Sequence, residues 1–235
     1  MKTLLLFDVD NTIVDSGKNI TLEMECILSS LTKKYDLGIV GGGTYEKIEK
    51  QLNPCMKIFK HVFVELGCIY YLNGKEKETK KDLRNHALKN SVDKIIKHSL
   101  QFLSQVPYEL DGHLIDFRKG LVYISLIGMS ADESKRQDFI NNYSFYRDYL
   151  LQSLIDLQIK DISIKKGGKV GIAIFPNEYD KIQVLSYLET YDKIYYFGDS
   201  YGSDGNDYQL LNHKDVTGVK VNNKTDTFAF LQKLL

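Results

Sequence analysis

Hydrophobic and polar positions divide the chain into short apolar runs and longer segments with a helical period. The first run, Leu4–Phe7, has no polar alternation and leads at once into Asp8 and Asp10. Such a run is typical of a strand buried on both faces, as in a parallel sheet. In open α/β sheets the functional side chains gather beyond the carboxyl ends of these strands. We therefore expect a metal site or reactive carboxylates here, although an acid after a strand can also cap a turn.

The rest of the first third continues this alternation of strands and helices. The predicted elements are a helix over 21–34 capped by Thr21, a strand over 37–40, a helix from Thr44 to Leu52, a strand over 62–64 and a hairpin beginning at Ile69 that turns at Asn73-Gly74. The glycine run Gly41-Gly42-Gly43 joins the second strand to the second helix. Backbone N–H groups of such a run can approach an anion closely, but a tight turn is an equally good interpretation.

The middle of the chain has a different character, with long helices and paired strands. The predicted elements are a helix over 81–105, antiparallel strands over 114–118 and 121–126, a helix over 132–157 with an aromatic stripe, and a hairpin over 162–175. The βα alternation then returns with a helix over 181–188, a strand over 193–197, a strand over 217–221 and a helix over 225–235. The pattern predicts an α/β Rossmann-like unit with a parallel sheet, residues 1–80 and 180–235, and an inserted α+β domain, residues 81–179.

Composition narrows the class of protein. Lys plus Arg and Asp plus Glu number 31 each, so no net field attracts nucleic acid or a membrane surface. Three cysteines without CxxC spacing predict a reducing compartment rather than a disulfide framework. No apolar stretch approaches the roughly 20 residues of a membrane span, and Asp8 interrupts any signal-peptide core. We expect a cytoplasmic protein without nucleic-acid or membrane partners.

Three distant segments supply the residues for phosphoryl transfer: Asp8-x-Asp10, Lys181, and Asp199 with Asn206-Asp207. A carboxylate nucleophile approaches a phosphate dianion only when a metal and a cation offset the repulsion. In this interpretation Asp8 attacks phosphorus, Asp10 is the acid/base and Lys181 screens the charges. Mg²⁺, which prefers oxygen ligands, would be held by Asp8, Asp10 (through its carbonyl), Asp199 and Asp207. Taken singly, Lys181 also fits a solvated helix residue, and Gly198-Asp199 a simple turn.

The motifs resemble those of the haloacid-dehalogenase superfamily, and within it the eukaryotic-type phosphomannomutases. The similar stretches are LFDVDNT (6–12), IVGGGTYEKIEKQL (39–52), DFRKG (116–120), FPNEYDK (175–181) and YFGDSYGSDGND (196–207). The resemblance implies an inserted cap, Mg²⁺, Asp8 and Asp10 as nucleophile and acid/base, and a homodimer formed through the cap. It also implies substrate contacts at Gly42, Thr44, Arg118 and Arg136, although the two arginines also fit ordinary salt bridges of the cap.

The chain departs from the family pattern at several positions. Asn11 replaces the usual glycine after the second Asp, and Gly43 replaces the serine that binds the transferred phosphoryl group, for which Thr44 is a possible substitute. Other family residues that hold the sugar and the second phosphate align with residues lacking a polar side chain: Gly17, Met129, Gly171 and Ala173. The resemblance therefore implies interconversion of hexose 6- and 1-phosphates, with a hexose bisphosphate activator. A related sugar phosphatase and a weakly active binding protein are the alternatives.

Overall fold

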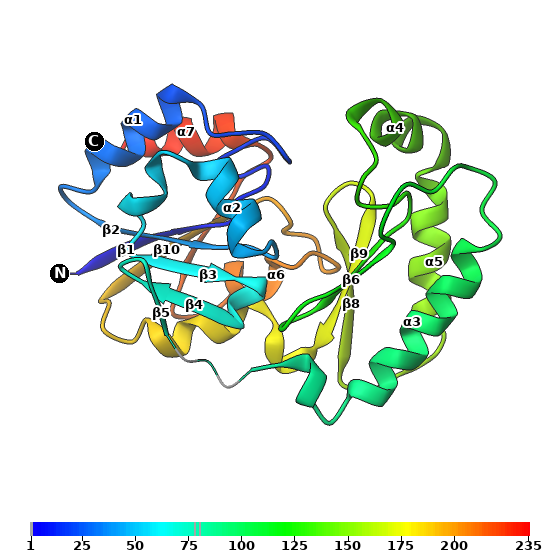
Figure 1. Cartoon of the computed structure of the whole chain (residues 1–235). Helices are drawn as coiled ribbons and strands as arrows, with labels where there is room; N and C mark the ends of the chain where they lie inside the picture. The colour runs from blue at the N-terminus through cyan, green and yellow to red at the C-terminus, as the bar shows by residue number, and fades with distance from the viewer. Residues whose placement is uncertain (1, 78, 80) are drawn as a thin grey trace. The chain divides into compact units, whose positions relative to one another are not determined.

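A computed structural model describes residues 2–77, 79 and 81–235, and these residues divide into two units (Figure 1). The core unit consists of Met1–Lys80 with Tyr179–Leu235, and the cap unit consists of Lys81–Glu178. Tyr179 lies with the core unit. Lys80, the last residue of the first predicted core segment, lies outside the described residues.

The core unit is built on a seven-stranded sheet in the order β11-β10-β1-β2-β3-β4-β5. The strands are β1 (Thr3–Phe7), β2 (Asp36–Val40), β3 (His61–Val64), β4 (Ile69–Leu72), β5 (Lys75–Lys77), β10 (Lys193–Gly198) and β11 (Thr217–Lys220). The first three strands, β10 and β11 are parallel, whereas β4 and β5 form an antiparallel hairpin. Asn73 and Gly74 have φ of 50° and 73° at its turn, as an Asn-Gly hairpin requires. The predicted parallel sheet and hairpin are confirmed.

Helices cover both faces of this sheet, which explains the uninterrupted apolar run of β1. Leu5 and Phe7 pack in one cluster and Leu4 and Leu6 in another on the opposite face. Figure 1 shows α1 and α7 side by side over the first face. The helical elements of this unit are α1 (Leu22–Leu31), α2 (Tyr45–Leu52), η1 (Cys55–Ile58), η2 (Glu65–Gly67), η6 (Lys181–Tyr187), α6 (Tyr208–Leu211) and α7 (Lys224–Gln232), with η5 (Asn177–Tyr179) at the boundary of the units.

Local signals set the ends of the core helices. The Thr21 hydroxyl accepts a hydrogen bond from the N–H of Met24 at 3.4 Å, so the predicted N-cap of α1 is confirmed. The predicted helix over 181–188 forms, but as a 3₁₀-helix. Asp180 caps it by accepting from the N–H of Ile182 at 3.2 Å. This short, tight segment carries Lys181 at its first position.

The cap unit is a four-stranded antiparallel sheet in the order β6-β7-β9-β8. The strands are β6 (Ile115–Phe117), β7 (Val122–Ser125), β8 (Ile162–Gly167) and β9 (Gly171–Pro176). Val122 and Ile124 of β7 join Ile172 and Ile174 of β9 in a cluster with the long helices α3 (Lys89–Leu103) and α5 (Phe145–Ile155). The predicted antiparallel pairs of the inserted domain are confirmed.

Both long helices predicted for the cap are interrupted. The helix predicted over 81–105 is wrong at its start, because a 3₁₀ turn, η3 (Leu83–Asn85), precedes α3. Asp82 caps this turn through the N–H of Arg84 at 2.9 Å, and His86 accepts from Leu88 N, so side chains compete with a continuous helix. The helix predicted over 132–157 consists of α4 (Glu133–Asp138), a π-helical turn η4 (Phe139–Tyr143) and α5. Periodicity alone does not signal such a wide turn.

A buried histidine network lies in the core unit. His61 is 5% exposed; its Nδ1 lies 2.9 Å from Tyr70 Oη and its Nε2 lies 2.6 Å from Tyr191 Oη. Since the Tyr191 hydroxyl donates to Asp36 at 2.6 Å, His61 donates through Nε2 and accepts from Tyr70. Burial, with the nearby Lys60 charge, lowers the pKa of His61 to about 4.

This histidine should make the fold sensitive to acid. The folded-state pKa lies below the unfolded value of about 6.5, so stability is lost as pH falls from about 6.5 toward 4. A shift of this size corresponds to at most about 3 kcal/mol. His61→Gln keeps a donor and an acceptor without titrating, so its unfolding free energy, measured with urea, should fall less than the wild-type value between pH 7 and 4.5. Equal pH slopes for the two proteins would contradict this.

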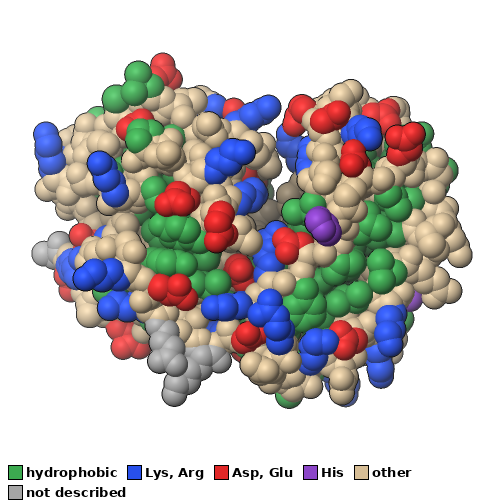
Figure 2. Space-filling view, in the orientation of Figure 1, with side chains coloured by type: hydrophobic (Ala, Val, Ile, Leu, Met, Phe, Trp, Pro, Cys, Tyr) green, Lys and Arg blue, Asp and Glu red, His purple; other side chains and the backbone are tan. Residues whose placement is uncertain are grey.

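Charges of both signs are interspersed over the face of the protein drawn in Figure 2, in agreement with the equal numbers of acidic and basic residues. Among the described residues, the helices are too short or too polar to span a bilayer.

Candidate active site

Asp8 lies directly after β1, at the carboxyl end of the parallel strands. Its backbone N–H donates to Phe197 O at 2.8 Å, which keeps the residue attached to β10 beyond the end of β1. Val9 is 2% exposed and packs in the hydrophobic core, while Asp8 is 7% exposed. The strand register therefore places the buried carboxylate of Asp8 at the edge of the sheet.

Lys181 joins two carboxylates inside the core unit. Its side chain is fully buried, and Nζ lies 2.5 Å from Asp8 Oδ1 and 2.6 Å from Asp207 Oδ1. The hydroxyl of Tyr196, also buried, donates to the same Asp207 oxygen at 2.5 Å and lies 3.4 Å from Nζ. The alternative that Lys181 is a solvated helix residue is wrong.

Asp207 and Asp199 complete a cluster of carboxylates around Asp8. The second oxygen of Asp207 accepts from the backbone N–H of Ser200 at 3.0 Å, and Asp199 accepts from Asn11 Nδ2 at 3.1 Å. A Cβ atom at Gly198 would lie only 2.7 Å from Asp207 Cγ, so glycine permits this close approach. Oxygen atoms of Asp8, Asp199 and Asp207 lie within 4.8 Å of one another.

The charges of this cluster fit a bound divalent cation. Burial raises the pKa of Asp8 well above its usual range, and the charges of Asp207 and Asp199 add to this against the opposing effect of Lys181. Burial and Asp207 likewise raise the pKa of Asp199. Burial opposes the charge of Lys181, but the two carboxylates outweigh it and raise the pKa of Lys181. Three carboxylates face one ammonium group, and hard oxygen ligands of this kind suit Mg²⁺.

The carboxylate of Asp10 makes a different set of contacts and is outside this three-residue cluster. Oδ1 accepts from the N–H of Gly17 at 3.0 Å and from Gln51 Nε2 at 2.9 Å, and Oδ2 pairs with Lys47 Nζ at 2.7 Å. Burial opposes ionisation, but the Lys47 charge and these hydrogen bonds outweigh it and lower the pKa of Asp10. Ligation of a metal by the Asp10 carbonyl stays a prediction.

The glycine loop between β2 and α2 is fixed by the turn after β3. The N–H of Leu66 donates to Gly41 O at 2.9 Å and that of Glu65 donates to Gly43 O at 3.0 Å. The Thr44 hydroxyl accepts from the N–H of Lys47 at 3.4 Å, so Thr44 is the N-cap of α2 as predicted. Gly42, predicted to contact the substrate, lies between these anchored residues at the amino end of α2.

In the cap unit, both predicted substrate-binding arginines contact neighbouring cap groups. Arg118 donates to Asp116 through Nε and pairs with the same carboxylate through Nη2, each at 2.7 Å. Arg136 donates to the carbonyls of Ala131 at 2.9 Å and Met129 at 3.3 Å. These contacts agree with the alternative in which the arginines are structural residues of the cap.

Tyr123 occupies the space beside two of the positions that lack a polar side chain. It pairs with Ala173 across β7 and β9, and its hydroxyl donates to Gly167 O at 2.9 Å. A Cβ atom at Gly171 would lie 2.3 Å from the Tyr123 hydroxyl oxygen, so a serine there would displace this ring. The Arg118 guanidinium lies 5.6 Å from the ring centroid, within cation–π distance.

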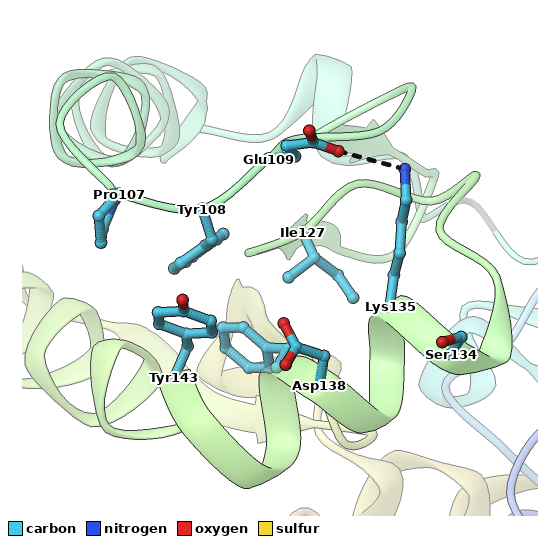
Figure 3. Close-up of a pocket in the computed structure, with 9 residues that line it drawn as sticks. Pro107, Tyr108, Glu109, Ile127, Ser134, Lys135, Asp138 and Tyr143 are labelled. Atoms are coloured by element: carbon cyan, nitrogen blue, oxygen red, sulfur yellow. Dashed lines mark ion pairs between the residues drawn. The ribbon is translucent and has the colours of Figure 1, made fainter.

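The cap unit also contains a pocket of about 450 Å³, shown in Figure 3. Aromatic side chains of Tyr108, Phe139 and Tyr143 line it, and Lys135 lies at its rim, paired with Glu109 at 3.7 Å. Its lining includes none of the predicted site residues. The predicted aromatic stripe of the second cap helix therefore serves the cap core and this pocket.

Several residues of the site were not predicted from the sequence. They are Asn11 as a hydrogen-bond donor, Lys47, Gln51, Tyr196 and Ser200. Lys47 and Gln51 are four residues apart on α2, so both lie on one helical face, and this spacing after the glycine loop is a signal that could have identified them. Ser200 contributes only its backbone N–H, so its side chain gives no indication of this contact.

Solved structures share the overall fold of this chain. The IMP-bound IMP-nucleotidase of Plasmodium falciparum aligns with a TM-score of 0.67 and 17% identity, covering 99% of this chain and 68% of that chain. The C-terminal domain of trehalose-6-phosphate phosphatase from C. albicans aligns with a TM-score of 0.66 and 15% identity, covering 99% and 91%. The fold is that of haloacid-dehalogenase-type phosphatases and phosphotransferases.

Sequence relatives define the family within this class. The family model described as eukaryotic phosphomannomutase matches residues 24–235. The phosphomannomutase of Encephalitozoon cuniculi is 30% identical over 242 residues, covering 100% of this chain and 94% of that protein. Phosphomannomutase 1 of Dictyostelium discoideum is 30% identical over 241 residues, covering 99% and 96%. The chain belongs to the eukaryotic phosphomannomutase family, a family of enzymes, and the predicted resemblance is confirmed.

Proposed function

We propose that this protein is a Mg²⁺-dependent phosphotransferase that converts mannose 6-phosphate to mannose 1-phosphate through an aspartyl-phosphate. The observation that carries the proposal is the buried contact of Lys181 with Asp8 and Asp207, next to Asp199. The names of the family relatives support the hexose phosphate substrate. A hexose bisphosphate is the proposed activator.

In the first half of the reaction Asp8 is the nucleophile. Lys181 contacts Oδ1, and no described residue donates a hydrogen bond to Oδ2, so Oδ2 attacks phosphorus. The bond between phosphorus and the sugar oxygen breaks, and Asp10 gives a proton to that leaving oxygen. In the second half Asp10 takes the proton from the accepting sugar hydroxyl, which attacks phosphorus and releases Asp8. Mg²⁺ held by Asp8, Asp199 and Asp207, when bound, would supply positive charge beside the phosphoryl oxygens.

The contacts of Asp10 suit its two roles in turn. Lys47 and Gln51 keep the free carboxylate ionised and oriented, which is the form that accepts a proton from a hydroxyl. The acid role requires a proton taken up before the leaving oxygen departs, and the approach of a phosphate dianion raises a neighbouring carboxyl pKa. Orientation by α2 therefore serves both halves of the reaction.

A sugar phosphatase is the second candidate, because specific features of the cap favour it. A mutase must hold a second phosphate group, and arginine is well suited to that because it makes bidentate charge-assisted bonds. Here Arg118 is paired with Asp116, Met129 lacks a polar side chain at a position that resembles a family substrate contact, and Tyr123 covers Gly171. In the phosphatase, water rather than a sugar hydroxyl releases Asp8 from the same intermediate.

One assay separates these functions. The protein is incubated with mannose 1-phosphate, Mg²⁺ and a hexose 1,6-bisphosphate, and mannose 6-phosphate and inorganic phosphate are quantified together. Mannose 6-phosphate in excess over phosphate supports the mutase, and phosphate alone supports the phosphatase. If neither product forms in the presence of Mg²⁺, the enzymatic proposal is refuted and the weakly active binding protein is the remaining alternative. A reaction with EDTA in place of Mg²⁺ is the metal-free control.

A homodimer through the cap and a cytoplasmic location complete the proposal. Phe145 and Tyr149 of α5 are 45% and 61% exposed, an aromatic pair that supports a protein interface on the cap. Sedimentation of the wild-type protein and of a Tyr149→Glu variant tests the dimer, which should dissociate in the variant.

The Lys47 contact gives a testable pH dependence. Lys47→Met removes the cation that helps to lower the pKa of Asp10, so this pKa should rise. The acidic limb of the kcat/KM profile should then move to higher pH, because the basic form of Asp10 is lost sooner as pH falls. Lys50→Met, on the same helix and exposed, is the matched control. An unchanged acidic limb in Lys47→Met would show that Asp10 does not set it.

A further inference from the structure

Asn11 connects the turn that carries Asp8 to the carboxylate of Asp199. Its Nδ2 donates to Asp199 Oδ2 at 3.1 Å, and its Oδ1 accepts from the backbone N–H of Ser16 at 3.3 Å. We propose that Asn11 is a positioning residue that holds Asp199 as a one-oxygen metal ligand and thereby favours Mg²⁺ over Ca²⁺. This inference rests on the proposed function, since it concerns the same metal site.

The backbone of Asn11 limits which residues can make this connection. Its φ is 59°, in the left-handed region, where glycine is unstrained and asparagine is among the better tolerated side chains. Glycine would fit the backbone but would lack the amide that reaches Asp199. Aspartate could accept from the N–H of Ser16, but its ionised carboxylate has no hydrogen to donate to Asp199. Asparagine satisfies both the backbone and the two hydrogen bonds.

The hydrogen bond fixes which part of Asp199 is available to a cation. The carboxylate lies in the group of three whose oxygens are within 4.8 Å of one another, and the Asn11 amide is bound to Oδ2. Coordination through both oxygens would engage Oδ2, so the ion would compete with the Asn11 amide for this oxygen. The Asn11 amide also keeps Asp199 oriented although Asp8 and Asp207, both negatively charged when ionised, lie beside it.

One-oxygen coordination distinguishes the two common divalent cations of cells. Mg²⁺ is small and demands octahedral ligands at about 2.0–2.1 Å, whereas Ca²⁺ takes six to eight oxygens at about 2.3–2.6 Å and readily uses both oxygens of one carboxylate. An Asp199 held by Asn11 therefore suits Mg²⁺. An Asp199 freed from Asn11 can rotate to give Ca²⁺ a second oxygen.

The test measures metal binding rather than turnover. Dissociation constants of Mg²⁺ and Ca²⁺ are determined by titration calorimetry for the wild-type protein and Asn11→Gly, without substrate. Loss of an outer contact to a metal ligand typically weakens binding about 10–100-fold, so we expect about a tenfold weaker Mg²⁺ affinity. Ca²⁺ affinity should change less, by about threefold or under, because of the added oxygen. The preference for Mg²⁺ over Ca²⁺ should therefore fall.

Two further variants control this measurement. Asn73→Gly makes the same substitution at another left-handed asparagine, φ 50°, in the turn between β4 and β5, and should leave both affinities unchanged. Asn11→Asp keeps the size and the acceptor for Ser16 but not the donor to Asp199, and should lose the preference for Mg²⁺ as Asn11→Gly does. Thermal unfolding without metal verifies that each variant is folded.

The outcomes separate this inference from the proposed function. Equal Mg²⁺ and Ca²⁺ affinities of wild type and Asn11→Gly would overturn the role of Asn11 while leaving the metal site in place. Absence of Mg²⁺ binding by the wild-type protein would overturn the metal site itself, and with it the inference. A fall in Mg²⁺ affinity with an equal fall for Ca²⁺ would also overturn it, because Asn11 would then support the site without discriminating between the ions.

Discussion

Asp8→Asn should abolish phosphoryl transfer, with turnover falling by about 10⁴-fold or more, because removal of a catalytic nucleophile costs this much in enzymes that work through a covalent intermediate. The amide can still accept a hydrogen bond from Lys181, so the buried network keeps its shape. It cannot, however, form a stable acyl phosphate. Transfer of labelled phosphoryl groups to the protein, trapped by acid quench, measures the intermediate directly and should be absent in the variant.

Asp93→Asn is the matched control for Asp8→Asn, since Asp93 belongs to helix α3 of the cap unit, where it pairs with Lys89 four residues away. It should retain wild-type labelling and turnover. If Asp8→Asn also retained both, the nucleophile would be another residue. If it lost turnover but kept the label, Asp8 would act after the intermediate has formed.

The layered fold of the core unit was predictable from the sequence because its strands are locally unambiguous. β1 is apolar on both faces, which is typical of a strand in a sheet that is covered on both sides. Thr44 indicates the start of α2, because its hydroxyl can cap a helix. The cap helices were less predictable. Their interruption at η3 and η4 depends on side-chain caps and a wide turn that leave the apolar period almost unchanged.

The acids of the site were predictable, but most of their partners were not. Asp8 and Asp199 follow strands, so the sheet itself brings them to one edge. Lys181 is the exception, because it was predicted together with the acids as part of a phosphoryl-transfer set, although it lies 173 residues from Asp8 and its local pattern also fits a solvated lysine. The position of Tyr123 could not be predicted, because an aromatic residue in a strand is ordinary. Only the pairing of β7 with β9 places Tyr123 against Gly171. Tertiary pairing therefore decides what surrounds the predicted residues.

Lys181→Met should have the largest effect on stability, because it leaves Asp8 and Asp207 without their shared cation. Removing one partner of a buried ion pair typically costs about 3–5 kcal/mol, since the remaining charge is buried and unpaired. The raised pKa of Asp8 should rise further without Lys181, so that Asp8 takes up a proton in the folded state nearer to neutral pH. Urea unfolding at pH 7 measures the loss, and turnover should fall with it because a protonated Asp8 is a poor nucleophile.

Mg²⁺ distinguishes the electrostatic cause of this loss from a packing defect. A divalent cation offsets the unpaired carboxylates, so Mg²⁺ should raise the unfolding midpoint of Lys181→Met more than that of the wild-type protein. Lys224→Met breaks the partly exposed pair with Asp15 and should cost no more than about 1 kcal/mol, with no added response to Mg²⁺. If Lys181→Met is destabilised but gains nothing extra from Mg²⁺, the loss comes from packing. In that case Lys181 does not act by balancing the charge of the carboxylate cluster that is proposed to bind the metal and the phosphate.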